Sequence, residues 1–172
     1  MRKLKANEIN VKVKQVNENG CLLLLYKDAR VDMQILDEEV GSENWQCDYK
    51  TINGVLYCGI GVARNDNGQK TWVWKWDCGI ESKADDDGNE KKGEASDAFK
   101  RAGFKWGIGR ELYTAPFIWA KVPTVNVGGK WYLKNKFQKF LVDTIDYNDQ
   151  GEISHLVIVD DKDTKIYSGR KQ

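Results

Sequence analysis

Residues 45–81, WQCDYKTINGVLYCGIGVARNDNGQKTWVWKWDCGIE, decide the predicted fold because they hold three strand candidates in a row. The candidates are residues 45–52, 55–64 and 71–81. Asn53-Gly54 and Asp66-Asn67-Gly68 separate them, and both sequences are typical of hairpin turns. The stretch therefore predicts an antiparallel meander of three strands.

One face of the third strand carries a row of large apolar side chains: Trp72, Trp74, Trp76, Cys78 and Ile80. Such a row is typical of a core, and a platform on which nucleic-acid bases stack is the alternative. Lys75 lies on the opposite face, where we expect a surface that contacts solvent or DNA.

A helix is predicted before the meander, from Asp28 as the N-cap to about Val40, with Gly41 at its end. Its apolar side chains form two stripes instead of the single stripe of a surface helix. Ala29, Met33, Leu36 and Val40 form one stripe, and Val31 and Ile35 lie nearly opposite. Two interpretations stay open: a helix enclosed in its own core, or a second stripe that contacts a neighbouring subunit.

A second helix is predicted after the meander, at about residues 94–106. Its apolar arc consists of Ala95, Ala98, Phe99, Ala102 and Trp106, which suits packing on a sheet. Residues 98–110 contain four cations and no acid: Lys100, Arg101, Lys105 and Arg110. Phe104 is out of place on this charged arc and could stack on a base, contact another subunit or lie under a loop.

Further hairpins are predicted near both ends of the chain. Residues 8–16 and 21–26 flank Asn19-Gly20, and residues 140–147 and 153–159 flank residues 148–151. The chain has 172 residues, and neither a repeat nor a flexible linker demands a second domain, so we expect one compact unit. No window is long and apolar enough to cross a membrane and no signal sequence is evident, which predicts a cytoplasmic protein.

The sequence offers few groups for catalysis. His155 is the only histidine, the four cysteines form no Cys-x-x-Cys pair, and no phosphate-binding loop ends in Gly-Lys-Ser/Thr. Acidic runs are typical of solvated surfaces, which disfavours a magnesium-dependent nuclease. We therefore expect no enzyme, no catalytic residues, no metal and no cofactor. The net charge is +1, so any affinity for DNA must come from local patches or repeated subunits.

Two runs of the second predicted helix and its end resemble the signature of phage Sak-type single-strand annealing proteins. These runs are KGEASDAFKRA at residues 92–102 and WGIGR at residues 106–110, followed by Leu112-Tyr113. Sak-type proteins are relatives of the N-terminal annealing domain of eukaryotic Rad-type recombination proteins. The resemblance extends back through Tyr57-Cys58, Asn44-Trp45, Arg30 and Tyr26-Lys27, and covers about residues 21–116.

The resemblance implies a β-β-β-α core, and the order helix, three-stranded antiparallel meander, helix matches it. With the hairpins predicted from the pattern, the expected fold is α+β with extra N- and C-terminal β-hairpins. We expect a single-strand annealing core over residues 1–122, with residues 123–172 as a C-terminal β-hairpin extension packed on or beside it. The resemblance further implies homo-oligomeric rings or helical filaments with single-stranded DNA in a positively charged groove, where Lys100 and Arg101 hold the backbone. The full set of expected DNA contacts is Lys100, Arg101, Lys105, Arg110, Arg30, Lys27, Tyr26, Lys75 and Phe104. Val31 and Ile35 are the expected oligomer interface.

The expected function is ATP-independent annealing of complementary strands in phage-type recombination and DNA repair. A host single-strand-binding protein or recombinase is a further candidate partner, and no membrane is expected. The alternatives are a single-strand DNA or RNA protective module that does not anneal, a nuclease, and a subunit whose Lys100 and Arg101 bind a partner's acids.

Overall fold

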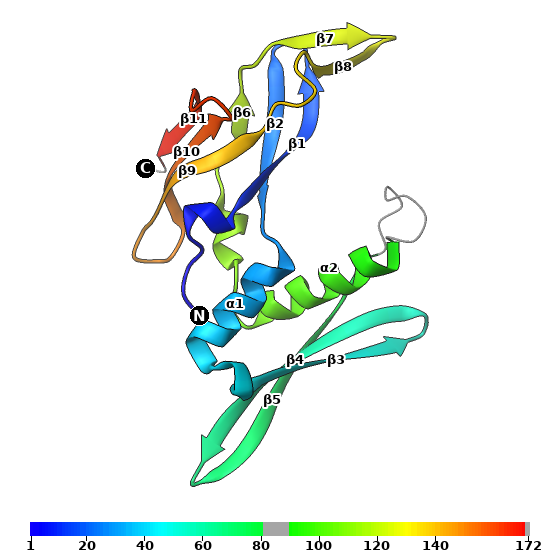
Figure 1. Cartoon of the computed structure of the whole chain (residues 1–172), viewed down its shortest axis with the longest axis vertical. Helices are drawn as coiled ribbons and strands as arrows, with labels where there is room; N and C mark the ends of the chain where they lie inside the picture. Colours follow the sequence, from blue (N-terminus) through cyan, green and yellow to red (C-terminus); the bar gives the residue numbers. More distant parts are fainter. Residues whose placement is uncertain (81–89, 171–172) are drawn as a thin grey trace. The chain divides into compact units, whose positions relative to one another are not determined.

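The chain forms two compact units in the computed structural model, which describes residues 1–80 and 90–170 (Figure 1). The helix–meander unit comprises Met1–Arg2 and Asp28–Gly109. The six-stranded unit comprises Lys3–Lys27 and Arg110–Gln172. Each unit therefore has its own core, and the second is assembled from two segments that are far apart in the sequence.

The helix–meander unit contains the predicted three-stranded sheet. Its elements are α1 (Ala29–Val40), a 3-10 turn (Ser42–Asn44), β3 (Trp45–Ile52), β4 (Val55–Asp66), β5 (Gln69–Cys78) and α2 (Glu90–Lys105). β4 lies between β3 and β5 and pairs antiparallel with both. Asn53 and Gly54 have φ values of 52° and 80°, which the tight hairpin turn requires. The meander is confirmed, although Glu81, predicted to end its third strand, lies outside the described residues.

Both predicted helices are present. The Asp28 side chain accepts a hydrogen bond from the Arg30 backbone N–H at 2.9 Å, and Gly41 ends α1 with a φ of 87°. α2 begins at Glu90, four residues before the predicted start. Figure 1 shows α1 and α2 on the same side of the meander.

The covered face of the meander is the one that carries Lys75. Trp106 directly follows α2, and its indole N–H donates to the Ile60 carbonyl at 2.9 Å. Lys75 Nζ lies 4.2 Å from the centre of a Trp106 ring. Trp72, Trp74 and Trp76 lie on the opposite face and are half-buried. The expected roles of the two faces are thus reversed, because alternation shows which side chains share a face and not which face a helix covers.

The six-stranded unit is a nearly closed, barrel-like sheet with the strand order β11-β10-β9-β1-β2-β6. These strands are β1 (Asn10–Asn17), β2 (Gly20–Tyr26), β6 (Ile118–Ala120), β9 (Phe140–Tyr147), β10 (Ile153–Asp160) and β11 (Lys165–Arg170). A separate two-stranded sheet consists of β7 (Thr124–Val127) and β8 (Lys130–Leu133), and two 3-10 turns lie at Ala6–Glu8 and Arg110–Thr114. β10 is the most buried strand, with Ile153, Leu156 and Ile158 at most 1% exposed.

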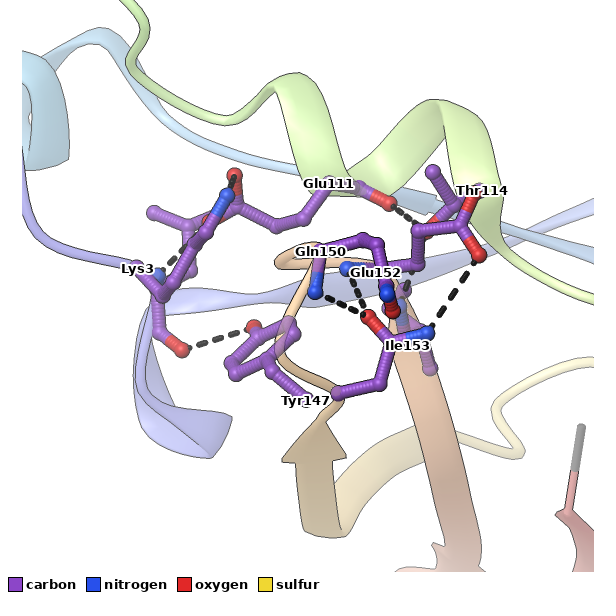
Figure 2. A network of polar contacts seen from close by, with 9 residues as sticks. Lys3, Glu111, Thr114, Tyr147, Gln150, Glu152 and Ile153 are labelled. Carbon is purple, nitrogen blue, oxygen red and sulfur yellow. Dashed lines mark hydrogen bonds and ion pairs between the residues drawn. The ribbon is translucent and has the colours of Figure 1, made fainter.

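A buried carboxylate connects the two segments of the six-stranded unit (Figure 2). Glu111 is 1% exposed, and its Oε1 accepts a hydrogen bond from the Leu4 backbone N–H at 2.8 Å. Its Oε2 lies 3.7 Å from the Lys3 ammonium, and the Tyr147 hydroxyl donates to the Leu4 carbonyl at 2.8 Å. Burial raises the pKa of Tyr147, so this hydroxyl keeps its proton and its hydrogen bond. The N-terminal residues are therefore fixed to segments more than a hundred positions later.

The expected fold class, an α+β fold with one core and appended terminal hairpins, is wrong. The chain is mostly β, and the strands expected as two terminal hairpins join one nearly closed sheet. The junction is the antiparallel pairing of β1 with β9 at Asn10 and Leu141. A pairing over such a sequence distance leaves no trace in local periodicity, so hairpins were all that the pattern could predict. The division at residue 122 into an annealing core and an extension stays a prediction.

Candidate nucleic-acid interface

α2 packs on the sheet through a face of small and apolar residues, and its cations flank that face. Ala98, Phe99 and Ala102 are at most 1% exposed, because small residues allow the helix to lie close to Cys58 and Ile60 of β4. The Phe99 ring meets Trp45 edge to face, with ring centres 6.1 Å apart. The basic residues of α2 lie beside this packed face, where Arg101 and Lys105 reach Asp77 and Trp76 of β5.

Two cations flank one carboxylate where α2 passes β5, and a third cation, Lys75, contacts the Lys105 carbonyl; we call Lys75, Asp77, Arg101 and Lys105 the Asp77 cluster. The Arg101 guanidinium lies 3.5 Å from Asp77 Oδ1, and Lys105 Nζ lies 3.6 Å from Oδ2. Lys105 Nζ also donates to the Trp76 carbonyl, and Lys75 Nζ donates to the Lys105 carbonyl at 3.0 Å. The Arg101 and Lys105 side chains are 43% and 46% exposed, so the net positive charge of the cluster remains accessible to an anion.

A groove of about 530 Å³ lies between the start of α1, the first turns of α2 and β3. It is lined by Asp28, Ala29, Arg30, Met33, Tyr49, Lys92, Gly93, Ser96 and Phe99. The hydrogen bond from the Arg30 backbone lowers the pKa of Asp28, and the Arg30 and Lys100 charges act in the same direction against desolvation. Lys100 is thus near enough to Asp28 to act on its charge, whereas Arg101 pairs with Asp77 of β5.

The predicted DNA contacts are divided between the two units. Lys100, Arg101, Lys105, Lys75, Arg30 and Phe104 belong to the helix–meander unit, and Tyr26, Lys27 and Arg110 belong to the six-stranded unit. Tyr26 is 40% exposed with Lys12 Nζ 5.6 Å from its ring centre, Arg110 is exposed and Phe104 is half-buried. Lys27 is only 8% exposed, which does not favour a phosphate contact. Of the predicted contacts in the helix–meander unit, Arg30 lines the groove, and Lys75, Arg101 and Lys105 belong to the Asp77 cluster.

The proposed subunit stripe is largely internal. Ile35 is fully buried and Val31 is half-buried, whereas Met33 is 38% exposed. The assignment of Val31 and Ile35 to an oligomer interface stays a prediction, and the burial of Ile35 does not favour it.

The tryptophan face of β5 has aromatic rings laid flat on the sheet. A Cβ on Gly59 would lie 2.5 Å from the Trp76 ring, and one on Gly61 would lie 2.8 Å from the Trp74 ring. The two indoles therefore cover glycines of β4, with ring centres 5.6 Å apart and planes inclined by 24°. Lys50 Nζ lies 4.3 Å from the Trp76 ring centre but also 3.5 Å from Asp48. The base-stacking alternative for this row stays open.

One candidate surface was missed from the sequence. Residues 112–142 contain no aspartate or glutamate, yet they include five lysines and several exposed aromatic side chains. A count of acids along the chain would have found this segment, whereas a search for family motifs did not.

No group of three or more potential metal ligands occurs in residues 1–80 and 90–170. His155 Nδ1 lies 3.2 Å from Asp146 Oδ2. Within the described residues, no helix is both long and apolar enough to span a bilayer. Comparisons of the chain with protein-family models, curated proteins and solved structures find no match. The case for a function therefore depends on the residues and geometry of this chain.

Proposed function

We propose that this protein binds single-stranded DNA and anneals complementary strands without ATP, as a Sak-type protein does. The observation that carries the proposal is that α2 holds Lys100, Arg101 and Lys105 beside its packed face, with the Arg101 and Lys105 side chains 43% and 46% exposed. These are the cations of the run that resembles the annealing family. The protein would act in phage-type recombination and repair, with a host single-strand-binding protein or recombinase as a candidate partner.

Annealing requires that a strand be held by its phosphates while the base edges remain free. Lysine and arginine contact phosphates without reading or blocking bases. Pairing then releases free energy by itself, since stacking contributes about 1.4 kcal/mol per base-pair step. The protein needs to supply alignment, and no nucleotide hydrolysis is required.

A single copy would hold a strand weakly. Each phosphate contact with a single strand contributes only about −0.7 to the slope of log affinity against log salt, and the net charge of the chain is +1. Side-by-side copies in a ring or filament raise the effective concentration of the cationic patch along one strand. We therefore include homo-oligomerisation in the proposal.

The test mixes two complementary fluorophore-labelled oligonucleotides with protein, without ATP or metal, and measures the pairing rate. The wild type should accelerate pairing, and Lys100→Ala with Arg101→Ala should reduce the acceleration by about tenfold or more while leaving assembly intact. Lys162→Ala with Lys165→Ala removes the same charge from exposed positions at the β10–β11 turn and should anneal normally. Binding without acceleration would favour a protective module, and normal annealing by the α2 variant would refute the residue assignment.

A further inference from the structure

The segment from Leu112 to Val142 differs from the rest of the chain in its charge. It lies between Glu111 and Asp143 and contains no acid. Its lysines are Lys121, Lys130, Lys134, Lys136 and Lys139. In a chain with 27 basic and 26 acidic residues, such a run concentrates positive charge in one place. A basic segment interleaved with aromatic residues is the composition that nucleic-acid-binding surfaces share.

The centre of this segment is the β7–β8 hairpin, which forms a sheet of its own within the six-stranded unit. Gly128 and Gly129 have φ values of 58° and 83°, so the strands join through a two-residue turn with both residues left-handed. The base of the hairpin is held by a hydrogen bond from the Thr124 hydroxyl to the Glu18 carbonyl at 3.1 Å. Figure 1 shows the hairpin beyond the ends of β1 and β2.

One face of this hairpin is outward and basic. Alternation along β8 places Lys130 and Tyr132 on one face, with Lys134 next in the same series, and Val127 and Val125 are their cross-strand partners. Tyr132 is 48% exposed and Val127 is 60% exposed, whereas the alternate residues Trp131 and Leu133 are half-buried. We call Val125, Val127, Lys130, Tyr132 and Lys134 the hairpin face.

The charges of this region are available to a ligand. All five lysines of the segment are exposed, and none of them forms an ion pair with another described residue. Lys136 Nζ lies 5.0 Å from the ring centre of Phe137, which is itself 74% exposed. Exposed aromatic rings beside unpaired ammonium groups provide both contacts that a single strand offers, namely a base to stack on and a phosphate to bind.

We infer that the hairpin face and the following loop bind single-stranded DNA, with Lys130, Lys134 and Lys136 on phosphates and Tyr132 and Phe137 stacked on bases. A protein partner fits less well, because protein–protein interfaces are depleted in lysine. This contact lies on the unit that does not carry α2. It rests on the proposed function in that it supplies a second DNA contact to an annealing protein.

The test measures binding of a labelled oligodeoxynucleotide to the full chain over a series of salt concentrations. Lys130→Ala with Lys134→Ala should weaken binding by about tenfold and reduce the salt slope by about 1.4, which is two contacts at about 0.7 each. Lys130→Arg with Lys134→Arg should restore both values. Tyr132→Ala with Phe137→Ala should weaken binding by about tenfold with an unchanged slope, because stacking carries no counterion release.

Lys162→Ala with Lys165→Ala is the matched control, because it removes equal charge from exposed positions of the same unit and should leave affinity and slope unchanged. If the Lys130/Lys134 variant binds as the wild type while the Lys100/Arg101 variant loses binding, the inference is overturned and the proposed function is supported. If the first loses binding and the second keeps both binding and annealing, the inference stands and the α2 assignment fails.

Two further outcomes would also overturn the inference. A wild type that binds no single-stranded DNA removes both the inference and the proposed function. A Lys130/Lys134 variant that binds DNA normally but has a smaller oligomer mass by light scattering would make the hairpin face a subunit contact.

Discussion

The Asp77 cluster and the hairpin face are both basic, but they differ in whether a carboxylate lies beside their cations. Arg101 and Lys105 lie 3.5 and 3.6 Å from the Asp77 carboxylate, and Lys75 contacts the Trp106 ring and the Lys105 carbonyl. The lysines of the hairpin region are exposed and have no carboxylate partner among the described residues. A phosphate must compete with Asp77 in the first case and only with water in the second.

A run that resembles a known family and a cation without a carboxylate partner therefore need not coincide. The motif that suggested annealing lies on α2, where cations also help to fix the helix on the meander. The hairpin lysines contribute little to packing, since exposed charges far from a partner have small effects on stability. Under the proposed function, DNA binding and packing would depend on the same side chains in the Asp77 cluster and on different ones in the hairpin face. Three experiments examine this contrast.

The largest effect is expected for a glycine in the packed region. Gly59→Ala places a Cβ 2.5 Å from the Trp76 ring, so the ring must move off the strand. We expect the free energy of unfolding to fall by about 1–3 kcal/mol, measured by denaturant titration with tryptophan fluorescence. Gly128→Asn is the matched change in the hairpin, where the φ of 58° suits asparagine and no atom lies within 4 Å, so stability should hardly change. Equal losses of unfolding free energy for Gly59→Ala and Gly128→Asn would contradict the contrast between the two regions.

An intermediate effect on stability is expected at Asp28, which lines the groove, whereas the hairpin segment contains no acid. Asp28→Ala removes the α1 N-cap and should lower the free energy of unfolding by about 1 kcal/mol at neutral pH, whereas Asp28→Asn keeps a cap. Hydrogen bonding to Arg30 lowers the pKa of Asp28 below 3.8, so its charge stabilises the fold above that pH. This contribution is lost as pH falls through the lowered pKa. Denaturant titrations at several pH values should show that Asp28→Asn lacks this acid-dependent loss.

The smallest effect is expected when the competing carboxylate is neutralised. Asp77→Asn keeps the oxygen that accepts from the Cys78 backbone N–H but frees Arg101 and Lys105 from an ion pair. Because exposed pairs are worth about 0.2–1 kcal/mol, affinity for a labelled oligonucleotide at low salt should rise by about two- to fivefold. The same substitution in the Lys130→Ala, Lys134→Ala background should give a similar gain. Unchanged binding after Asp77→Asn would show that the cluster does not contact DNA.

Much of the local structure was predictable because local chemistry specifies it. The hairpin turns at Asn53-Gly54 and Asn67-Gly68 and the boundaries of α1 follow from residues that tolerate or require particular backbone angles. The arc of α2 that holds the cations was also predictable, because helical periodicity assigns residues to an arc from their spacing alone. The β7–β8 hairpin was missed, although Gly128-Gly129 marks its turn.

Local patterns in the sequence were sufficient to predict which residues form strands and helices in the meander region and which side chains share a face. Three features became evident only in the folded protein: α2 covers the Lys75 face, Asp77 pairs with Arg101 and Lys105, and β1 pairs with β9 in a second core. Periodicity and turn chemistry depend only on residues that are near one another in the sequence. The choice of covered face and the pairing of distant strands depend on burying apolar area across the whole chain, which no local pattern records.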